Sequence, residues 1–214
     1  YEELIEEIAT NDKVILAELA IQSGSDSVLK TMNTGTTVSE LQMLLDRLSH
    51  KPMRSIFVTS HPYETMEDVQ KTIEFIKKNN LWYPIVTSCK NSEGTPLHQM
   101  EQLEKEEYRK HYNLIAQTVL KLQDKFLNSL IGTFVYGYLF MLTRYEEYDM
   151  ADITLQARDF RGQIIVRIKN YSSSPYKSIL DSVEEGNLAK TRITSIRSNN
   201  AENIALLAED LEVL

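Results

Sequence analysis

The chain has 214 residues, of which 42% are hydrophobic and 25% are charged, and its formal net charge is −8. This composition is typical of an ordinary globular protein with a real core. No apolar run approaches the roughly 20 residues of a membrane span, and the acidic first residues differ from the basic start of a signal peptide. We therefore expect a cytoplasmic protein that does not contact the membrane. The acidic balance argues against simple electrostatic attraction to a nucleic-acid backbone.

The first hundred residues alternate between helical and strand-like patterns. Amphipathic helices are expected around residues 1–12, 37–50 and 67–78, and short apolar strands around 14–21, 55–59 and 82–88. Strict alternation of this kind predicts parallel strands joined by crossover helices. Three strands alone leave a poorly covered sheet, so the segment is typical of part of a larger α/β barrel whose first strands are absent, disordered or supplied elsewhere.

The second part of the chain has another pattern. Residues 104–130 predict one long amphipathic helix that connects two domains, and from residue 131 onward the apolar residues recur with period two. Several short strands within about 80 residues favour a small antiparallel barrel of the oligonucleotide-binding type. The expected fold class is therefore α/β, with a partial parallel (β/α) barrel followed by a small antiparallel β-barrel.

Three short segments carry the strongest functional signal. They are Gln22-Ser-Gly-Ser-Asp26, Ser60-His-Pro-Tyr-Glu-Thr65 and Ser92-Glu-Gly-Thr-Pro96, and each follows one of the predicted strands. Together they resemble the later strands of the radical S-adenosylmethionine methylthiotransferases. This resemblance implies three regions: the C-terminal half of a radical enzyme barrel in 1–103, a connector helix in 104–130 and a TRAM-like barrel in 131–214.

The first segment matches a turn that lies beside S-adenosylmethionine in that family. The resemblance implies that Gln22, Gly24 and Ser25 contribute to cofactor binding, and a Gly-Ser turn at a helix N-terminus offers donors that suit a carboxylate or a ribose. The alternative is a helix-capping turn without a ligand, with Ser25 or Ser27 as the cap.

The second segment implies Ser60 and Glu64 as further cofactor-binding residues. The family usually has Gly-Phe-Pro-Gly-Glu-Thr here, so Ser60 and Tyr63 occupy glycine positions. Glycine in such loops admits either close approach of a ligand or an unusual φ angle. The neighbouring His61 is interpreted equally well as a ligand-binding residue or as a packed or solvent-facing loop residue, and a lone histidine supports no metal site.

The single cysteine, Cys89, limits the chemistry of this chain. The family binds a [4Fe-4S] cluster with a Cys-x-x-x-Cys-x-x-Cys loop, because thiolates are the ligands that the cluster requires. One cysteine cannot provide that site, nor a disulfide framework. We expect Cys89 to be a structural thiol, no residue of this chain to be catalytic or to bind metal, and the chain alone to be inactive.

Three arginines in the second half are candidates for a substrate surface. Arg158 and Arg161 lie in the stretch 157–166, which is reminiscent of the family's TRAM domain, and Arg167 and Lys169 follow it. Beside aromatic residues, these cations predict either a face that binds RNA or an acidic protein loop, or an ordinary solvated strand.

The resemblance implies a transferase that uses S-adenosylmethionine and a [4Fe-4S] cluster. Its ribosomal branch modifies an aspartate of a small-subunit ribosomal protein, and its other branch modifies an adenosine of tRNA. The His-Pro variant and the residues around Arg158 favour the ribosomal branch. The alternatives are a tRNA-modifying fragment, a catalytically dead module that binds S-adenosylmethionine, RNA or protein, and an unrelated α/β enzyme.

Overall fold

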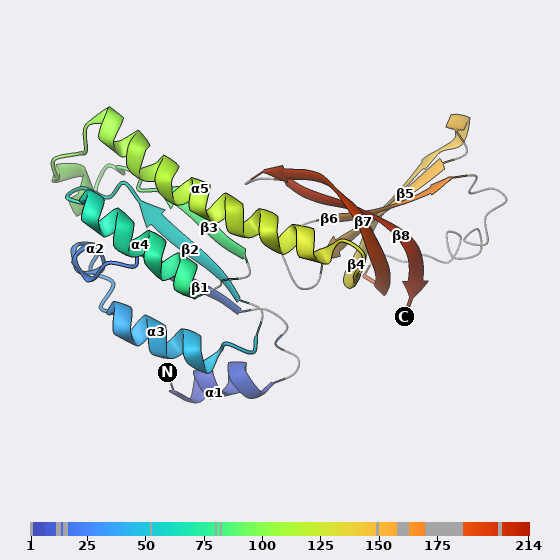
Figure 1. Cartoon of the computed structure of the whole chain (residues 1–214), viewed down its shortest axis with the longest axis horizontal. Helices are drawn as coiled ribbons and strands as arrows, with labels where there is room; N and C mark the ends of the chain where they lie inside the picture. The colour runs from blue at the N-terminus through green and yellow to red at the C-terminus, as the bar shows by residue number, and fades with distance from the viewer. Residues whose placement is uncertain are drawn as a thin grey trace. The chain divides into compact units, whose positions relative to one another are not determined.

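The computed structural model describes residues 2–11, 14, 17–51, 53–79, 81, 83–148, 150–157, 163–169, 186–200 and 203–214. The chain divides into two compact units, Tyr1–Gln123 and Asp124–Leu214 (Figure 1). Among the described residues, no helix is long and apolar enough to span a bilayer.

The first unit contains the predicted parallel sheet. Strands β1 (Ala17–Gln22), β2 (Met53–Thr59) and β3 (Tyr83–Ser88) pair in that order, and both pairs are parallel. The helices between them are α2 (Asp26–Thr31), α3 (Val38–Arg47) and α4 (Met66–Lys78), preceded by α1 (Glu2–Thr10) and followed by the short 3₁₀ turn η1 (Pro96–Gln99) and by α5 (Lys105–Leu130). The expected alternation of helices and parallel strands is therefore confirmed.

Local sequence explains where two of these helices begin. Thr37 caps α3 and Thr65 caps α4, each by accepting a hydrogen bond from the backbone N–H three residues on. The acidic residues Glu40 and Asp68 complete both capping boxes by accepting from the cap backbone. The start of α2 differs, because Ser25 occupies the N-cap position but makes no side-chain capping bond.

One face of the parallel sheet packs against helices. Along β2 the residues Met53, Ser55, Phe57 and Thr59 are buried, whereas the alternate residues between them are half-buried. Phe57 belongs to a core that also contains apolar residues of α3, α4 and α5. Parallel strands are normally covered on both faces, so the half-buried face indicates a sheet that is incomplete within the described residues.

The second unit is a closed five-stranded barrel with the order β4-β5-β6-β8-β7. Its strands are β4 (Phe134–Tyr145), β5 (Met150–Ala157), β6 (Gln163–Lys169), β7 (Leu188–Asn200) and β8 (Asn203–Val213), with a 3₁₀ turn η2 (Glu146–Tyr148) after β4. Ile153, Leu155, Ile164, Ile193 and Leu206 fill its interior. The prediction of a wholly antiparallel barrel is wrong in one pair, since β6 and β8 run parallel. This pair is non-local, and a strand pattern does not encode which strands close a barrel.

Candidate functional site at the sheet edge

The carboxyl ends of the three parallel strands lie at one edge of the sheet, where α/β proteins bind their ligands. The first two strands end at Gln22 and Thr59. Gln22 is itself implied in cofactor binding, and the loops that follow the two strands contain the other four implied residues. A backbone bond from the N–H of Cys89 to the carbonyl of Thr59 (2.7 Å) links the third strand end to the second. The structure therefore gathers the first two motifs, which are 38 residues apart from Gln22 to Ser60, at one edge.

Gly24 serves the close packing of helix α4 against the first loop. A Cβ atom at this position would meet the Cβ of Phe75 at 2.6 Å, the Cα of Thr72 at 2.7 Å and the carbonyl oxygen of Lys71 at 2.9 Å. Two of these three atoms belong to the helix backbone, which cannot move aside as a flexible side chain can. The glycine is thus explained by contact with the protein itself.

Polar side chains fasten the same loop to α4. Ser25 donates through its hydroxyl to Oδ1 of Asp68 at 2.6 Å, and the hydroxyl of Ser27 donates to the same oxygen. The backbone N–H of Gly24 donates to the hydroxyl of Thr72 at 3.1 Å. Both the Gly24 amide and the Ser25 hydroxyl, which could have received a ligand, therefore have partners within the protein.

Asp68 is held as a carboxylate by this network. Burial alone would raise its pKa, but hydrogen bonds from Ser25, Ser27 and both the hydroxyl and the backbone of Thr65 hold the pKa well below its usual range. The residue was not among those implied by the resemblance. Its place three residues after Thr65, which forms a capping box, was the signal available in the sequence.

The loop after β2 holds two residues in the left-handed region. Ser60 has φ of 60° and Tyr63 has φ of 67°, and these are the positions at which the resembled family has glycine. Glycine was expected here either for close approach of a ligand or for an unusual φ angle, and the structure shows the unusual φ angle. A side chain in this region costs about 1–2 kcal/mol relative to glycine.

Glu64 is buried at the centre of this loop. Its Oε2 accepts from the hydroxyl of Thr59 (2.9 Å), the backbone N–H of Ser60 (2.7 Å) and Nδ1 of His111 (3.0 Å). Burial raises the pKa of Glu64, and the bonds from Ser60, Thr59 and His111 oppose that shift. Oε1 of Glu64 and Nε2 of His111 are buried without a hydrogen-bond partner.

Sequence reasoning missed His111, which is fully buried on α5 and pairs with Glu64 47 residues away. The same helix accepts a hydrogen bond from the hydroxyl of Ser60 at the carbonyl of Tyr108 (2.9 Å). Two contacts therefore tie the start of α5 to the loop after β2. His61, by contrast, is buried with Nδ1 2.7 Å from the carbonyl oxygen of Pro62, so it packs within its own loop.

Gln22 lines a pocket at the end of β1. Its φ is 69°, it is half-buried, and the pocket of about 320 Å³ lies between the end of β1 and the segment from Met32 to Thr36. The pocket also includes Ala20 and Leu29. Gln22 therefore lines open space at the end of a strand.

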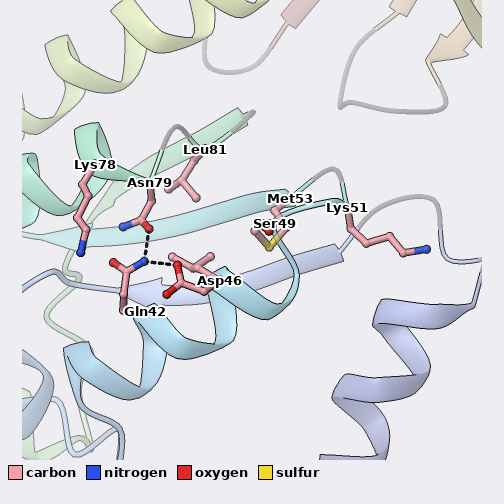
Figure 2. Close-up of a pocket in the computed structure, with 9 residues that line it drawn as sticks. Gln42, Asp46, Ser49, Lys51, Met53, Lys78, Asn79 and Leu81 are labelled. Carbon is pink, nitrogen blue, oxygen red and sulfur yellow. Dashed lines mark hydrogen bonds between the residues drawn. The ribbon is translucent and has the colours of Figure 1, made fainter.

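A second pocket, of about 350 Å³, lies at the opposite edge of the sheet (Figure 2). It includes Met53, the first residue of β2, and its polar wall is a bridge in which Nε2 of Gln42 donates to Asp46 at 2.8 Å and to Asn79 at 2.7 Å. Figure 2 shows Gln42 on α3 with its hydrogen bonds to Asp46 of the same helix and to Asn79 at the end of α4. The amino ends of parallel strands are not where such folds bind ligands, so we interpret the bridge as a packing feature.

Only one of the three arginines falls in the described part of the chain. Arg158 and Arg161 lie outside the described residues. Arg167 donates two hydrogen bonds to Asp152, from Nε at 2.8 Å and from Nη2 at 2.7 Å, and this pairing raises the pKa of Arg167. The positive charge of Arg167 is therefore largely neutralised by Asp152 on the adjacent strand β5.

The residues present fit the implied cofactors unequally. A [4Fe-4S] cluster does not fit, because it requires several thiolates and the chain has only Cys89, whose pKa is raised by burial and by the nearby Glu64. Within the ranges that the structure describes, no group of three His, Cys, Asp or Glu could hold a metal ion. S-adenosylmethionine fits in part: Gln22 lines a pocket at the expected edge, while Gly24, Ser25, Ser60 and Glu64 form its support through internal contacts.

No protein-family model matches this chain. A solved structure of archaeal Methanocaldococcus infernus Elp3 with an N-terminal deletion covers all of this chain and 59% of its own, at 12% identity and a TM-score of 0.44, which does not establish a shared fold.

Several curated proteins match at the level of sequence. Ribosomal protein uS12 methylthiotransferase RimO of Caldanaerobacter subterraneus is 32% identical over 137 residues, covering 62% of this chain and 31% of that protein. RimO of Geotalea uraniireducens is 27% identical over 201 residues, covering 89% of this chain and 42% of its own. A tRNA-2-methylthio-N(6)-dimethylallyladenosine synthase of Buchnera aphidicola is 29% identical over 146 residues, covering 64% of this chain and 33% of its own.

The chain spans about a third to two fifths of the length of these three relatives. The alignment with the Geotalea protein leaves out about a tenth of this chain, so it extends into the barrel unit. The names of these relatives specify two different targets, ribosomal protein uS12 and a tRNA adenosine. A relative of each kind matches this chain at about 30% identity. Over this part of their length, the chain is therefore similar in sequence to methylthiotransferases of the RimO kind and of the tRNA-modifying kind.

Proposed function

We propose that this chain is the C-terminal portion of a radical S-adenosylmethionine methylthiotransferase that modifies an aspartate of the small-subunit ribosomal protein uS12. The observation that carries the proposal is the similarity to proteins named uS12 methylthiotransferase, at 32% and 36% identity over 137 and 110 residues. In this proposal the protein acts in the cytoplasm, and the chain alone has no radical activity.

The architecture supports different roles for the two units in this proposal: the first is part of the radical enzyme barrel, and the second presents the substrate. The parallel sheet has a half-buried face and only three strands within the described residues, as expected for the second half of a barrel that further strands would complete. The closed barrel of the second unit is then the TRAM-like domain that presents the substrate. In this arrangement Arg158, Arg161 and Arg167 contact the substrate, and the bonds from Arg167 to Asp152 mean that a substrate must share Arg167 with this carboxylate.

The contacts at the sheet edge suggest what each implied residue contributes. Gln22 reaches the cofactor from the pocket at the end of β1, and Gly24 and Ser25 hold the backbone of that turn against α4. Ser60 and Glu64 hold the neighbouring loop against α5 through Tyr108 and His111. S-adenosylmethionine supplies the methyl group and the radical precursor in this family, and the cluster that cleaves it must be bound by residues outside this chain.

The proposal can be tested with a chimera. The corresponding C-terminal part of RimO from Caldanaerobacter subterraneus is replaced by this chain, and methylthiolation of uS12 is measured by mass spectrometry in cells that lack their own enzyme. We expect modified uS12. A chimera that assembles its cluster but leaves uS12 unmodified would reject the proposed target. A chimera in which Gln22 is replaced by alanine should keep the cluster and bind S-adenosylmethionine more weakly.

The absence of radical activity in the chain alone has its own test. After anaerobic treatment with iron and sulfide, we expect no cluster absorption in the visible range and no formation of 5′-deoxyadenosine. A stable cluster that cleaves S-adenosylmethionine would contradict the proposal.

One observation favours each of two alternatives. The match to a tRNA-modifying enzyme supports a tRNA adenosine as the target, and mass spectrometry of tRNA from the same cells would detect it. The replacement of glycine by Ser60 and Tyr63 at left-handed positions supports a catalytically dead binding module. In that case the chimera would modify neither uS12 nor tRNA.

A further inference from the structure

The imidazole of His111 on α5 lies between two carboxylates. Its Nδ1 is 3.0 Å from Oε2 of Glu64, and its Nε2 is 3.8 Å from Oε1 of Glu107, one helical turn earlier on α5. The side chains of His111 and Glu64 are 0% and 1% exposed, whereas the side chain of Glu107 is 50% exposed. One ring thus connects a fully buried carboxylate with a carboxylate that reaches the solvent.

The hydrogen bonds around Glu64 indicate which nitrogens of this ring carry a proton. Oε2 of Glu64 accepts from the hydroxyl of Thr59 and from the backbone N–H of Ser60, so Nδ1 of His111 is a third donor to the same oxygen. In a neutral ring, Nε2 would then carry a lone pair 3.8 Å from the Glu107 carboxylate. In an imidazolium, Nε2 carries a proton and faces an opposite charge. The geometry favours the imidazolium.

Burial favours the same proton count. A buried carboxylate without a compensating charge is costly, and burial raises the pKa of Glu64. A proton shared by Glu64 and His111 leaves the pair without net charge, whichever residue carries it. Two other titratable groups lie near the pair. His61 is hydrogen-bonded within its own loop, and the pKa of the Cys89 thiol is raised by burial and by the charge of Glu64, so this thiol stays protonated at neutral pH.

The pair holds a loop whose backbone is strained. Ser60 and Tyr63 have φ angles of 60° and 67°, which residues other than glycine keep only where the surrounding contacts enforce them. Both anchors of Ser60 lead to the start of α5. Its backbone N–H donates to Glu64, which is bonded to His111, and its hydroxyl donates to the carbonyl of Tyr108, three residues before His111. Loss of the shared proton would leave an uncompensated buried carboxylate at this anchor and would weaken it.

We propose that the cluster of Glu64, His111 and Glu107 is a pH-sensitive contact that holds the loop after β2 against α5, so that a rise in pH releases the loop and weakens ligand binding at this edge of the sheet. His111 is a positioning residue in this proposal, because it acts on the edge through Glu64 and Ser60. The inference rests on the proposed function only where it identifies the ligand as S-adenosylmethionine. Release of the loop is a property of the chain itself.

The test measures hydrogen exchange of single amides in the 214-residue chain by NMR, from about pH 6 to about pH 9. Each rate is divided by the rate of an unstructured peptide at the same pH, which gives a protection factor. Protection of the Ser60 N–H, which donates to Glu64, should fall by roughly 10- to 150-fold, the ratio expected for loss of a hydrogen bond to a charged group. The Thr65 N–H is the internal control. It donates to Asp68, whose lowered pKa keeps that carboxylate ionised throughout, so its protection should stay constant.

Three variants separate the pH-sensitive contact from ordinary packing. His111→Gln keeps a neutral donor but cannot take up a proton, so protection of the Ser60 N–H should become independent of pH. Glu107→Gln removes the outer carboxylate and should move the loss of protection to lower pH. Glu106→Gln is the matched control, since it changes the net charge equally in the same exposed helical turn, and it should leave the pH profile unchanged. If His111→Gln does not fold, the comparison of Glu107→Gln with Glu106→Gln decides the result.

The RimO chimera tests the effect on the ligand. S-adenosylmethionine itself titrates in this pH range, so its affinity is compared at each pH between the chimera and its His111→Gln variant. The ratio of the two affinities should fall as pH rises, and a constant ratio would contradict the effect on the ligand.

Other outcomes would overturn the pH-sensitive contact itself. It fails if protection of the Ser60 N–H does not depend on pH, if the Thr65 N–H loses protection to the same extent, or if Glu107→Gln and Glu106→Gln have the same pH profile. A chimera that binds no S-adenosylmethionine at any pH would contradict the proposed function, and the exchange profile of the chain would still decide whether the contact responds to pH.

Discussion

The loops that follow β1 and β2 each contain positions at which the resembled family has glycine, and these positions serve different physical purposes. In the first loop Gly24 is required for room, because a Cβ would meet the backbone of α4, and its φ is not left-handed. In the second loop Ser60 and Tyr63 have left-handed φ angles, and Tyr63 is 60% exposed. The comparison shows that a glycine position in a family motif can mean either space or backbone angle, and that only the second kind tolerates replacement at moderate cost.

The largest effect is expected from the contact that anchors the second loop. His111→Ala removes a donor from the buried Glu64 and leaves a cavity beside it, so the free energy of unfolding of the first unit should fall by about 3 kcal/mol. The measurement is urea unfolding followed by the fluorescence of the single tryptophan, Trp82. His98→Ala, at an exposed histidine, is the control and should change stability by less than about 0.5 kcal/mol. Equal stability of the two variants would show that the pair does not anchor the loop.

The second-largest effect distinguishes a glycine required for close packing from a glycine required for its backbone φ angle. Gly24→Ala should destabilise the first unit by about 2–3 kcal/mol, because its Cβ would force α4 away from the loop. Gly35→Ala is the matched variant: Gly35 has a φ of +69°, but a Cβ there would meet no atom within 4 Å, so only backbone strain of about 1 kcal/mol applies. If Gly24→Ala cost no more than Gly35→Ala, close packing would not explain Gly24.

The two loops should also respond to pH in opposite directions. The pKa of Asp68 is lowered in the folded state, so its stabilising contribution is complete above the unfolded pKa of about 3.9 and is lost as pH falls. The pKa of Glu64 is raised, so its contribution is complete below the unfolded pKa of about 4.3 and is lost as pH rises. Stability curves from pH 2 to pH 7 for Asp68→Asn and Glu64→Gln should each lose one of these slopes. Two variants with the same pH dependence as the wild type would contradict the assignment.

The smallest effect is a gain in stability. Tyr63→Gly should relieve left-handed strain of about 1–2 kcal/mol while increasing the entropy of the unfolded chain by about 0.5–1 kcal/mol, which leaves a net gain of about 0.5 kcal/mol. Tyr63→Ala keeps the strain and should show no gain. Thermal unfolding of both variants provides the measurement, and a stabilising Tyr63→Ala would show that the tyrosine side chain, not the angle, is unfavourable.

Much of the first unit was predictable because its signals are local. Alternating apolar runs predicted three parallel strands, and Thr37 and Thr65 with their acidic partners mark two helix starts within four residues each. The pairing of Glu64 with His111 was not predictable, since a lone histidine on an amphipathic helix carries no sign of a partner 47 residues earlier. Likewise the role of Gly24 depends on how closely α4 approaches, which is a tertiary distance.

In the barrel, sequence reasoning found the strand pattern and placed the functional surface around arginines. Phe134, Tyr138 and Phe140 on β4 were visible as alternate aromatic residues, but their exposure was not, because alternation alone does not say which face of a closed sheet is outside. The parallel β6–β8 pair escaped prediction for a related reason: it joins Gln163 to Ala205, which are 42 residues apart (205 − 163).

That parallel pair has a consequence for how the barrel is made. Strand β8 lies between β6 and β7, so the last of the five strands to leave the ribosome is also the one that closes the barrel. Until it emerges, β6 and β7 each have an unpaired edge, and such edges are sites of aggregation. A nascent or prematurely terminated chain that ends before Ala205 would keep both edges open, so the barrel closes only once β8 has been synthesised.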